Sequence, residues 1–182
     1  MREYFSKVAK DYGAEVPFIR PKELSDDHTP TIPVIKHAIE WFESYNKTIL
    51  DVCCLYATAP FIKSEFIINA YKQFKKSNCK YCFSVTSFVF PIQRAIKILE
   101  NNKVSMFYPK NFNIRSQDLK ESYHDAGQFY WGEADAFKKE VPIFSNEAEA
   151  FILPRYLVQD IDSIEDWIRA ELMYKALKLT TK

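Results

Sequence analysis

The chain has 182 residues, of which 47% are apolar and 16% aromatic, and its formal net charge is +1. The apolar fraction is higher than in disordered chains, and a chain of this length can bury a sizeable core. We therefore expect a single domain over residues 1–182. The near-neutral charge, without a concentrated basic face, argues against a nucleic-acid partner. No apolar run reaches the length of a membrane span, and the charged first residues do not resemble a secretory signal, so we expect a cytoplasmic protein without a membrane partner.

The spacing of apolar residues predicts alternating helices and strands in the first half of the chain. A helix over residues 2–12 should end at Gly13, and a second helix should follow the proline-rich loop 21–33. Buried strands are expected at 49–55 and 81–88, with a helix between them. This order predicts a right-handed β-α-β unit within an α/β sheet that has helices on both faces.

The pattern changes between residues 90 and 145. Short segments at 95–99 and 104–106 predict an antiparallel hairpin, and residues 127–131 form a further extended, aromatic run. The chain should then return to the main sheet at 150–153 and close with a helix. The positions of that helix that we expect to face the core are Ile164, Trp167, Ile168, Leu172 and Ala176.

The four cysteines raise the possibility of a zinc or redox site. Cys79 and Cys82 have the CxxC spacing, and Cys53 and Cys54 are a possible second pair. Adjacent residues of a strand point to opposite faces, which makes it difficult for both members of the second pair to join one site. Cys54 and Cys82 also lie in apolar runs, so we interpret the cysteines as buried free thiols.

Two aspartates, Asp160 and Asp162, are the clearest candidates for chemistry, and the run before them has the composition of a strand. Residues two apart in an extended segment point to the same side, so both carboxylates could bind one hard cation while Ile161 packs inward. Ser163 and Asp166 have the spacing of a capping box. These residues alone leave open the alternative that the segment only caps a helix and that Asp160 is a solvated loop residue.

Five motifs in the same order resemble the pseudaminic acid cytidylyltransferases, a group within the CMP-sialic acid synthetase family. They are residues 13–27, 56–61, 115–118, 124–130 and 155–162. The resemblance implies a Rossmann-like sheet of the nucleotide-diphospho-sugar transferase type and a homodimer formed through an excursion at residues 90–145. It also implies Mg²⁺-dependent transfer of a cytidylyl group from CTP to a nine-carbon 2-keto acid sugar, which prepares the sugar for attachment to surface glycans or flagellin.

The resemblance also assigns roles to the charged residues. Asp160 and Asp162 match the family's metal-binding aspartates, and a cation held there would neutralise the triphosphate of CTP. Arg115 is the preferred partner of the sugar carboxylate, because a guanidinium can bind a carboxylate through two hydrogen bonds, and Arg155 is the second candidate. For Arg115 the alternative is an exposed ion pair with Asp118.

Six further positions match the sugar pocket of the family. The first of them, Tyr56, differs from the residue that the sialic acid enzymes have at the corresponding position. This difference fits a different sugar. For Thr58 the alternative is a role in shaping the turn, and for His124 it is a structural, partly buried imidazole. The six positions are Tyr56, Thr58, Gln117, His124, Asp125 and Gln128.

The chain departs from the family at the loop that binds the phosphates of CTP. Family members begin with a strand and a loop rich in glycine and arginine, whereas this sequence has three glycines, Gly13, Gly127 and Gly132, none of them close enough together to form a phosphate cradle. By the resemblance, Met1 falls inside the helix after the second strand of the family. We therefore expect a domain without the first strands and the CTP loop, and low CTP-dependent activity of this chain alone, unless a separate polypeptide supplies them.

Three functions remain open at this stage. The first is a pseudaminic acid cytidylyltransferase; the residues 56–60 and 124–128 favour this sugar over N-acetylneuraminic or legionaminic acid. The second is a catalytically inactive module that binds the sugar or forms a dimer. The third is a zinc or thiol protein built on the cysteines.

Overall fold

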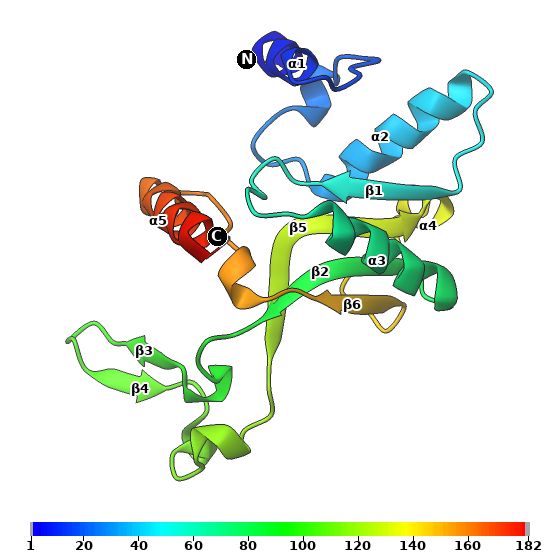
Figure 1. Cartoon of the computed structure of the whole chain (residues 1–182). Helices are drawn as coiled ribbons and strands as arrows, with labels where there is room; N and C mark the ends of the chain where they lie inside the picture. Colours follow the sequence, from blue (N-terminus) through cyan, green and yellow to red (C-terminus); the bar gives the residue numbers. More distant parts are fainter. Residues whose placement is uncertain (1, 181–182) are drawn as a thin grey trace. The chain divides into compact units, whose positions relative to one another are not determined.

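A computed structural model describes residues 2–180, which form a mixed α/β fold around a central sheet (Figure 1). This confirms the predicted fold class. The α-helices are α1 (Arg2–Asp11), α2 (Thr31–Ser44), α3 (Ser64–Lys76), α4 (Ala134–Lys138) and α5 (Ile164–Thr180). The strands are β1 (Asp51–Leu55), β2 (Tyr81–Ser87), β3 (Ile96–Ile98), β4 (Val104–Met106), β5 (Tyr123–Glu133) and β6 (Ala148–Ile152). The short 3₁₀ helices are η1 (Lys22–Leu24), η2 (Ile92–Arg94), η3 (Pro109–Asn111), η4 (Ser116–Asp118) and η5 (Arg155–Leu157).

The contacts divide the chain into two units. The first contains the residues up to Val52 together with Glu133–Pro142, and the second contains Cys53–Gly132 and the residues from Ile143 onward. No helix within residues 2–180 is long and apolar enough to cross a membrane.

The first unit is organised around α2. Its apolar stripe buries Ile35 and Ile39, and α2 packs against α4. An ion pair between Lys138 and Glu43, at 2.8 Å, joins these two helices. In the same unit, α1 ends at Asp11, and Gly13, two residues later, has a φ of +88°, the left-handed conformation expected just after a helix.

The central sheet has the strand order β1-β5-β2-β6. The strands and the helix of the predicted β-α-β unit are present as β1, α3 and β2, but β5 lies between β1 and β2. β2 pairs with β5 in the antiparallel and with β6 in the parallel direction. The aromatic run at 127–131, which the sequence analysis placed in the excursion, therefore belongs to the main sheet, where Phe129 is completely buried.

The pairing of β5 with β2 is interrupted by a bulge. Phe83 lies opposite Tyr130 and Val85 opposite Asp125, so two steps along β2 correspond to five along β5. The hydroxyl of the buried Ser84 accepts hydrogen bonds from the backbone N–H groups of residues 128 and 129, at 3.3 and 3.1 Å. Such a bulge redirects the side chains at its edge.

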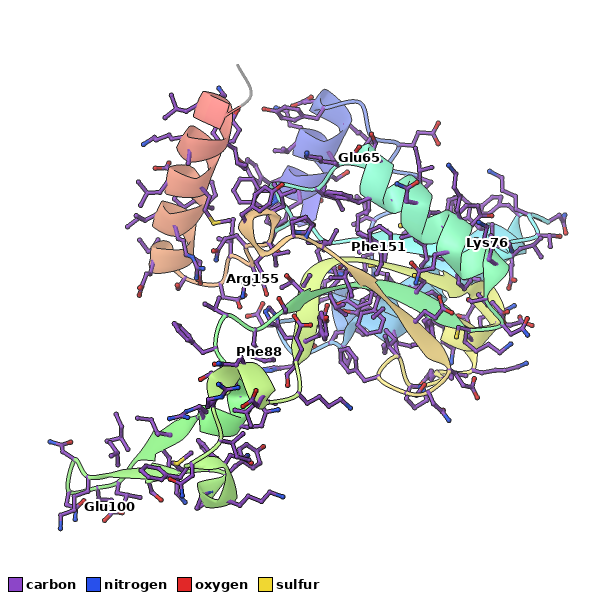
Figure 2. The ribbon with its side chains drawn as sticks, turned by 60° about the horizontal axis from the view of Figure 1, so that its bottom comes forward. Glu65, Lys76, Phe88, Glu100, Phe151 and Arg155 are labelled. Atoms are coloured by element: carbon purple, nitrogen blue, oxygen red, sulfur yellow. The ribbon has the colours of Figure 1, made fainter. Side chains whose placement is uncertain are left out.

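The predicted hairpin is confirmed as β3 and β4, which pair with each other. Within the second unit this hairpin and the turns η3 and η4 extend away from the sheet (Figures 1 and 2). We call residues 88–118 the arm. The arm exposes large apolar side chains, among them Phe90 at 79%, Ile98 at 74% and Phe112 at 67%.

The predicted core stripe of α5 is wrong, because all five of its positions are exposed. The helix instead buries Ala170 against Phe61 and Leu157, and Met173 and Leu177 pack around this cluster. The sequence of α5 is apolar on more than one side, so the spacing of apolar residues cannot decide which side faces the core.

The cysteines are free thiols. Cys82 is completely buried, as predicted, whereas Cys53, Cys54 and Cys79 are half-buried. Burial raises the pKa of the Cys82 and Cys53 thiols to about 12 and that of the Cys54 thiol to about 11. These three groups are therefore protonated near neutral pH, which makes them poor nucleophiles.

Candidate functional site

A cavity of about 520 Å³ opens in the second unit where β2 ends. β2 and β6 are parallel, so their carboxyl ends meet here, at the edge where open α/β sheets bind their ligands. Three segments form the walls: the residues after β2, the first part of β5, and the chain from η5 into α5. The lining residues that carry charge or an imidazole are His124, Asp125, Arg155, Asp160, Asp162, Asp166 and Arg169.

Five of the residues that the sequence analysis singled out line this cavity together. They come from two motifs that are about 30 positions apart in the sequence, so the fold has brought them to one place. They are His124, Asp125, Arg155, Asp160 and Asp162.

Asp160 is held by its neighbours, whereas Asp162 is not. The Oδ1 atom of Asp160 accepts hydrogen bonds from the backbone N–H of Ile161, at 3.0 Å, and from the hydroxyl of Thr58, at 3.3 Å. Thr58 itself does not line the cavity, so in this structure it acts on the site through Asp160. Within residues 2–180, the carboxylate of Asp162 has no hydrogen bond or ion pair. Ile161 packs against the cluster of Phe61 and Leu157, as predicted.

The run before these aspartates is not a strand, which corrects the expectation from its composition. Leu153 still donates its N–H to the carbonyl of Val85, at 2.8 Å, but the next residue is Pro154. Because proline has no N–H to continue the ladder, the pairing stops and the chain forms the 3₁₀ turn η5. The two aspartates follow in irregular backbone and both still line the cavity.

The predicted capping box at the start of α5 is confirmed. The hydroxyl of Ser163 accepts a hydrogen bond from the N–H of Asp166, at 3.3 Å, and the Asp166 carboxylate accepts from the N–H of Ser163, at 3.0 Å. The Ser163 hydroxyl also donates to this carboxylate, at 2.7 Å. These bonds, led by the one from the Ser163 side chain, lower the pKa of Asp166. The capping box fixes the point where the segment that carries Asp160 and Asp162 enters α5.

On the opposite wall, both oxygens of Asp125 are bonded. Oδ1 accepts a hydrogen bond from the backbone N–H of Gly127, at 2.9 Å, and Oδ2 accepts one from the hydroxyl of Tyr130. The neighbouring His124 is exposed; its Nδ1 donates to the carbonyl of Asp125, at 2.7 Å, because a carbonyl can only accept. Its ring packs against Phe88, with the ring centres 4.8 Å apart.

The two walls meet at Gly127. A Cβ at this position would lie 3.5 Å from Oδ2 of Asp160, and the φ of Gly127 is +59°. Its N–H is the donor to Asp125. Gly127 is therefore bonded to one carboxylate, and a side chain here would contact the other; the left-handed backbone at this point also favours glycine.

The two candidate arginines lie in different environments. Arg155 lines the cavity and donates to the carbonyl of Phe88, at 3.3 Å; Figure 2 labels both residues. Arg115 does not line it, and its guanidinium donates two hydrogen bonds to Asp118, at 2.8 and 3.1 Å. This exposed pair is the alternative that the sequence analysis left open. Arg169, from α5, is a second arginine of the cavity, and the sequence analysis missed it.

Besides Thr58, three of the predicted sugar contacts do not line the cavity. Gln117 is exposed on η4. Tyr56 packs against Tyr130, with the ring centres 5.3 Å apart. Gln128 is 1% exposed and donates to the carbonyl of Leu157, at 2.7 Å, so its observed role is to hold η5 against β5. The burial of Gln128 follows from the bulge, which a sequence pattern does not reveal.

Residues 2–180 contain no cluster of three or more histidine, cysteine, aspartate or glutamate side chains that could hold a metal ion. A cation at Asp160 and Asp162 would therefore need further ligands from water or from a bound phosphate. Mg²⁺ is commonly held in this way, by one or two carboxylates together with substrate phosphates.

Comparisons with known proteins agree with the motifs. The profile of a family described as cytidylyltransferase matches residues 2–178. Two pseudaminic acid cytidylyltransferases from strains of Campylobacter jejuni are 46% and 44% identical to the chain over 173 residues, which cover 95% of the chain and 75% of each relative. A solved CMP:2-keto-3-deoxy-manno-octonic acid synthetase, complexed with CTP, matches with a TM-score of 0.56 at 10% identity, over 94% of this chain and 78% of that one, so the two share a fold. The chain therefore belongs to the cytidylyltransferase family of nucleotidyltransferases, and the two relatives with 46% and 44% identity are pseudaminic acid cytidylyltransferases.

Proposed function

We propose that the cavity at the end of β2 binds pseudaminic acid for the transfer of CMP from CTP to this sugar. The observation that carries the proposal is the convergence of Asp125, Arg155, Asp160 and Asp162 on one cavity. The two relatives with 46% and 44% identity support the choice of sugar, because both are named pseudaminic acid cytidylyltransferases.

In the proposed reaction, the oxygen of the anomeric hydroxyl attacks the α-phosphorus of CTP. A bond forms between that oxygen and the phosphorus, and the bond from the phosphorus to the oxygen that bridges to the β-phosphate breaks. Pyrophosphate leaves and the hydroxyl loses its proton. The reaction is displacement at phosphorus, so positioning of the groups and neutralisation of phosphate charge account for most of the catalysis.

Asp160 and Asp162 would hold the Mg²⁺ ion. Their chemistry fits this role, because oxygen ligands suit a hard cation and Asp162 has no competing hydrogen bond within the described part of the chain. When bound, the cation would neutralise phosphate charge. Thr58 and the N–H of Ile161 keep the Asp160 carboxylate at the edge of the cavity.

The sugar would lie between the arginines and Asp125. Arg155 is the preferred partner of the sugar carboxylate, since it lines the cavity while Arg115 is paired elsewhere. Asp125, which can only accept hydrogen bonds when ionised, would bind hydroxyl or amide N–H groups of the sugar. His124 lies beside it on the same wall.

We also propose that the arm forms the contact of a homodimer. The support is its run of exposed apolar side chains, since residues such as Phe90 and Phe112 are costly to leave in water. Light scattering should give the mass of a dimer. Phe112→Lys should shift it toward the mass of a monomer, whereas Tyr12→Lys, at an exposed aromatic residue just after α1, should not.

Calorimetric titration tests the proposed function, because sugar binding can be measured even if this chain turns over slowly. Pseudaminic acid should bind more tightly than N-acetylneuraminic or legionaminic acid. Any pyrophosphate released from CTP should follow the same order of sugars. Absence of pseudaminic acid binding, or tighter binding of either other sugar, would contradict the proposal.

A further inference from the structure

The bulge in β5 creates a contact that a regular strand cannot make. Asp125 and Tyr130 are five positions apart; in an extended strand they would be roughly 17 Å apart and on opposite faces. Here the hydroxyl of Tyr130 donates a hydrogen bond to Oδ2 of Asp125. The contact exists because the register of β5 shifts opposite Phe83 and Val85, and because Gly127 adopts a positive φ. The fold thus brings one specific hydroxyl to a carboxylate of the cavity.

The ring of Tyr130 is fixed by its surroundings. It is 4% exposed and stacks on Phe83, with ring centres 5.8 Å apart and an angle of 16° between the planes. It also contacts Tyr56, which follows β1. Burial, followed by the hydrogen bond to Asp125, raises the pKa of Tyr130 above its ordinary value, so the hydroxyl remains a donor near neutral pH.

The consequence falls on Asp125. With a single donor, from the N–H of Gly127, its carboxylate could rotate about the bond between Cβ and Cγ. With the second donor, from Tyr130, each oxygen has a fixed partner. The lone pairs that remain are then held in one direction at the cavity wall.

We propose that Tyr130 is a positioning residue for sugar binding: it holds the Asp125 carboxylate in the orientation that accepts hydrogen bonds from the hydroxyl or amide groups of the sugar. This inference rests on the proposed function of the cavity. Tyr130 does not line the cavity, so its effect on the ligand must pass through Asp125.

The substitution Tyr130→Phe removes the hydroxyl and keeps the ring that packs on Phe83 and Tyr56. Pseudaminic acid is titrated calorimetrically into the wild-type chain, Tyr130→Phe, Asp125→Asn and the double variant. We expect Tyr130→Phe to weaken binding roughly ten-fold, the scale of one hydrogen bond to a charged group. Because Tyr130 acts through Asp125, the double variant should bind as weakly as Asp125→Asn and no more weakly.

The matched control is Tyr123→Phe. Tyr123 is on the same strand and its hydroxyl also donates to a carboxylate, that of Glu121, at 2.7 Å, but it is outside the cavity. This variant should bind the sugar as the wild type does. Unchanged binding by Tyr130→Phe, or effects of the two substitutions that multiply in the double variant, would overturn the proposal.

Crystal structures separate this inference from the proposed function. In Tyr130→Phe the Asp125 carboxylate should be rotated or present in two conformers, whereas in Tyr123→Phe it should keep both hydrogen bonds. An unchanged Asp125 in Tyr130→Phe overturns the positioning role whether or not the sugar binds. If the wild-type chain binds no pseudaminic acid, the proposed function fails, and the role of Tyr130 in sugar binding fails with it. The crystal structures still decide whether Tyr130 orients the Asp125 carboxylate.

Discussion

The two walls of the cavity that carry carboxylates, β5 and the chain from η5 into α5, hold them in different ways. On the β5 wall, Asp125 has a donor on each oxygen, one of them a buried phenol. On the wall that leads into α5, Asp160 has both of its donors on the same oxygen, and Asp162 has none within the described residues. One wall is therefore fixed before any ligand arrives, and the other keeps carboxylate oxygens free.

This difference indicates two kinds of ligand. A carboxylate fixed by neutral donors keeps lone pairs in a set direction, which suits the directional hydrogen bonds of a sugar. Carboxylates without donors are suited to a cation, because a metal ion replaces their hydration. The structure thus separates a proposed sugar wall from a proposed metal wall, and Gly127, which donates to Asp125, lies close enough to Asp160 that an added Cβ would contact it.

The largest expected effect comes from the metal wall. Asp162→Asn should lower the rate of cytidylyl transfer at least about 100-fold, because a neutral amide is a poor ligand for a divalent cation. The melting temperature should not change, since the carboxylate of Asp162 has no partner within residues 2–180. Glu165→Gln, which removes a nearby charge outside the cavity, serves as the control for pyrophosphate release and thermal melting.

Next in size is the loss of Arg155, the cavity arginine at the start of η5. Arg155→Ala should weaken pseudaminic acid binding roughly 10- to 100-fold, the scale of a hydrogen-bonded charge pair. Arg115→Ala is the matched control, because Arg115 is exposed and paired with Asp118 outside the cavity. Calorimetry that shows the larger loss for Arg115→Ala would reverse the assignment and support the first choice of the sequence analysis.

A smaller effect is expected where the walls meet. Gly127→Ala should lower the free energy of unfolding by about 1–2 kcal/mol, because a residue with a side chain is strained at positive φ. It should also weaken sugar binding, since the new methyl group would contact Asp160. Gly13→Ala is the control: its backbone is strained in the same way at φ +88°, but a Cβ there would have no atom within 4 Å. In urea unfolding, Gly13→Ala should lose a similar free energy of unfolding, and its sugar binding should not change.

The smallest effect concerns the capping box beside the metal wall. Ser163→Ala should lower the free energy of unfolding by about 1 kcal/mol at neutral pH. The pKa of Asp166 is lower in the folded chain than its ordinary value of 3.8, so the bond to Ser163 contributes fully to stability when the pH is above 3.8. This contribution is lost as the pH falls through the lower pKa that Asp166 has in the folded chain. In urea titrations, the difference between wild type and Ser163→Ala should therefore shrink below pH 3.8; a constant difference would contradict this account.

Features that depend on local sequence could be predicted. The spacing of apolar residues gives α2 and α3, the capping pair Ser163 and Asp166 gives the start of α5, and a glycine gives the end of α1. Each of these depends on residues within a few positions of one another, and a single chain shows such patterns directly. The two aspartates Asp160 and Asp162, singled out from their spacing and the family resemblance, both line the cavity, while their role as metal ligands stays a prediction.

The remaining features depend on contacts between distant residues. β5 enters the sheet between β1 and β2, which no local pattern specifies. The core side of α5 is set by Phe61, more than 100 positions earlier in the chain, and the expected stripe was therefore wrong. The position of Arg155, rather than Arg115, at the cavity and the bond between Tyr130 and Asp125 have the same origin, because the bulge and η5 decide which side chains meet.

A crystal structure of the chain with pseudaminic acid would test the central claim most directly. We expect the sugar in the cavity at the end of β2, with its carboxylate bonded to Arg155 and a hydroxyl or amide group donating to Asp125. A sugar bound at Arg115, or anywhere that leaves Asp125 and Arg155 without contact to it, would contradict the account.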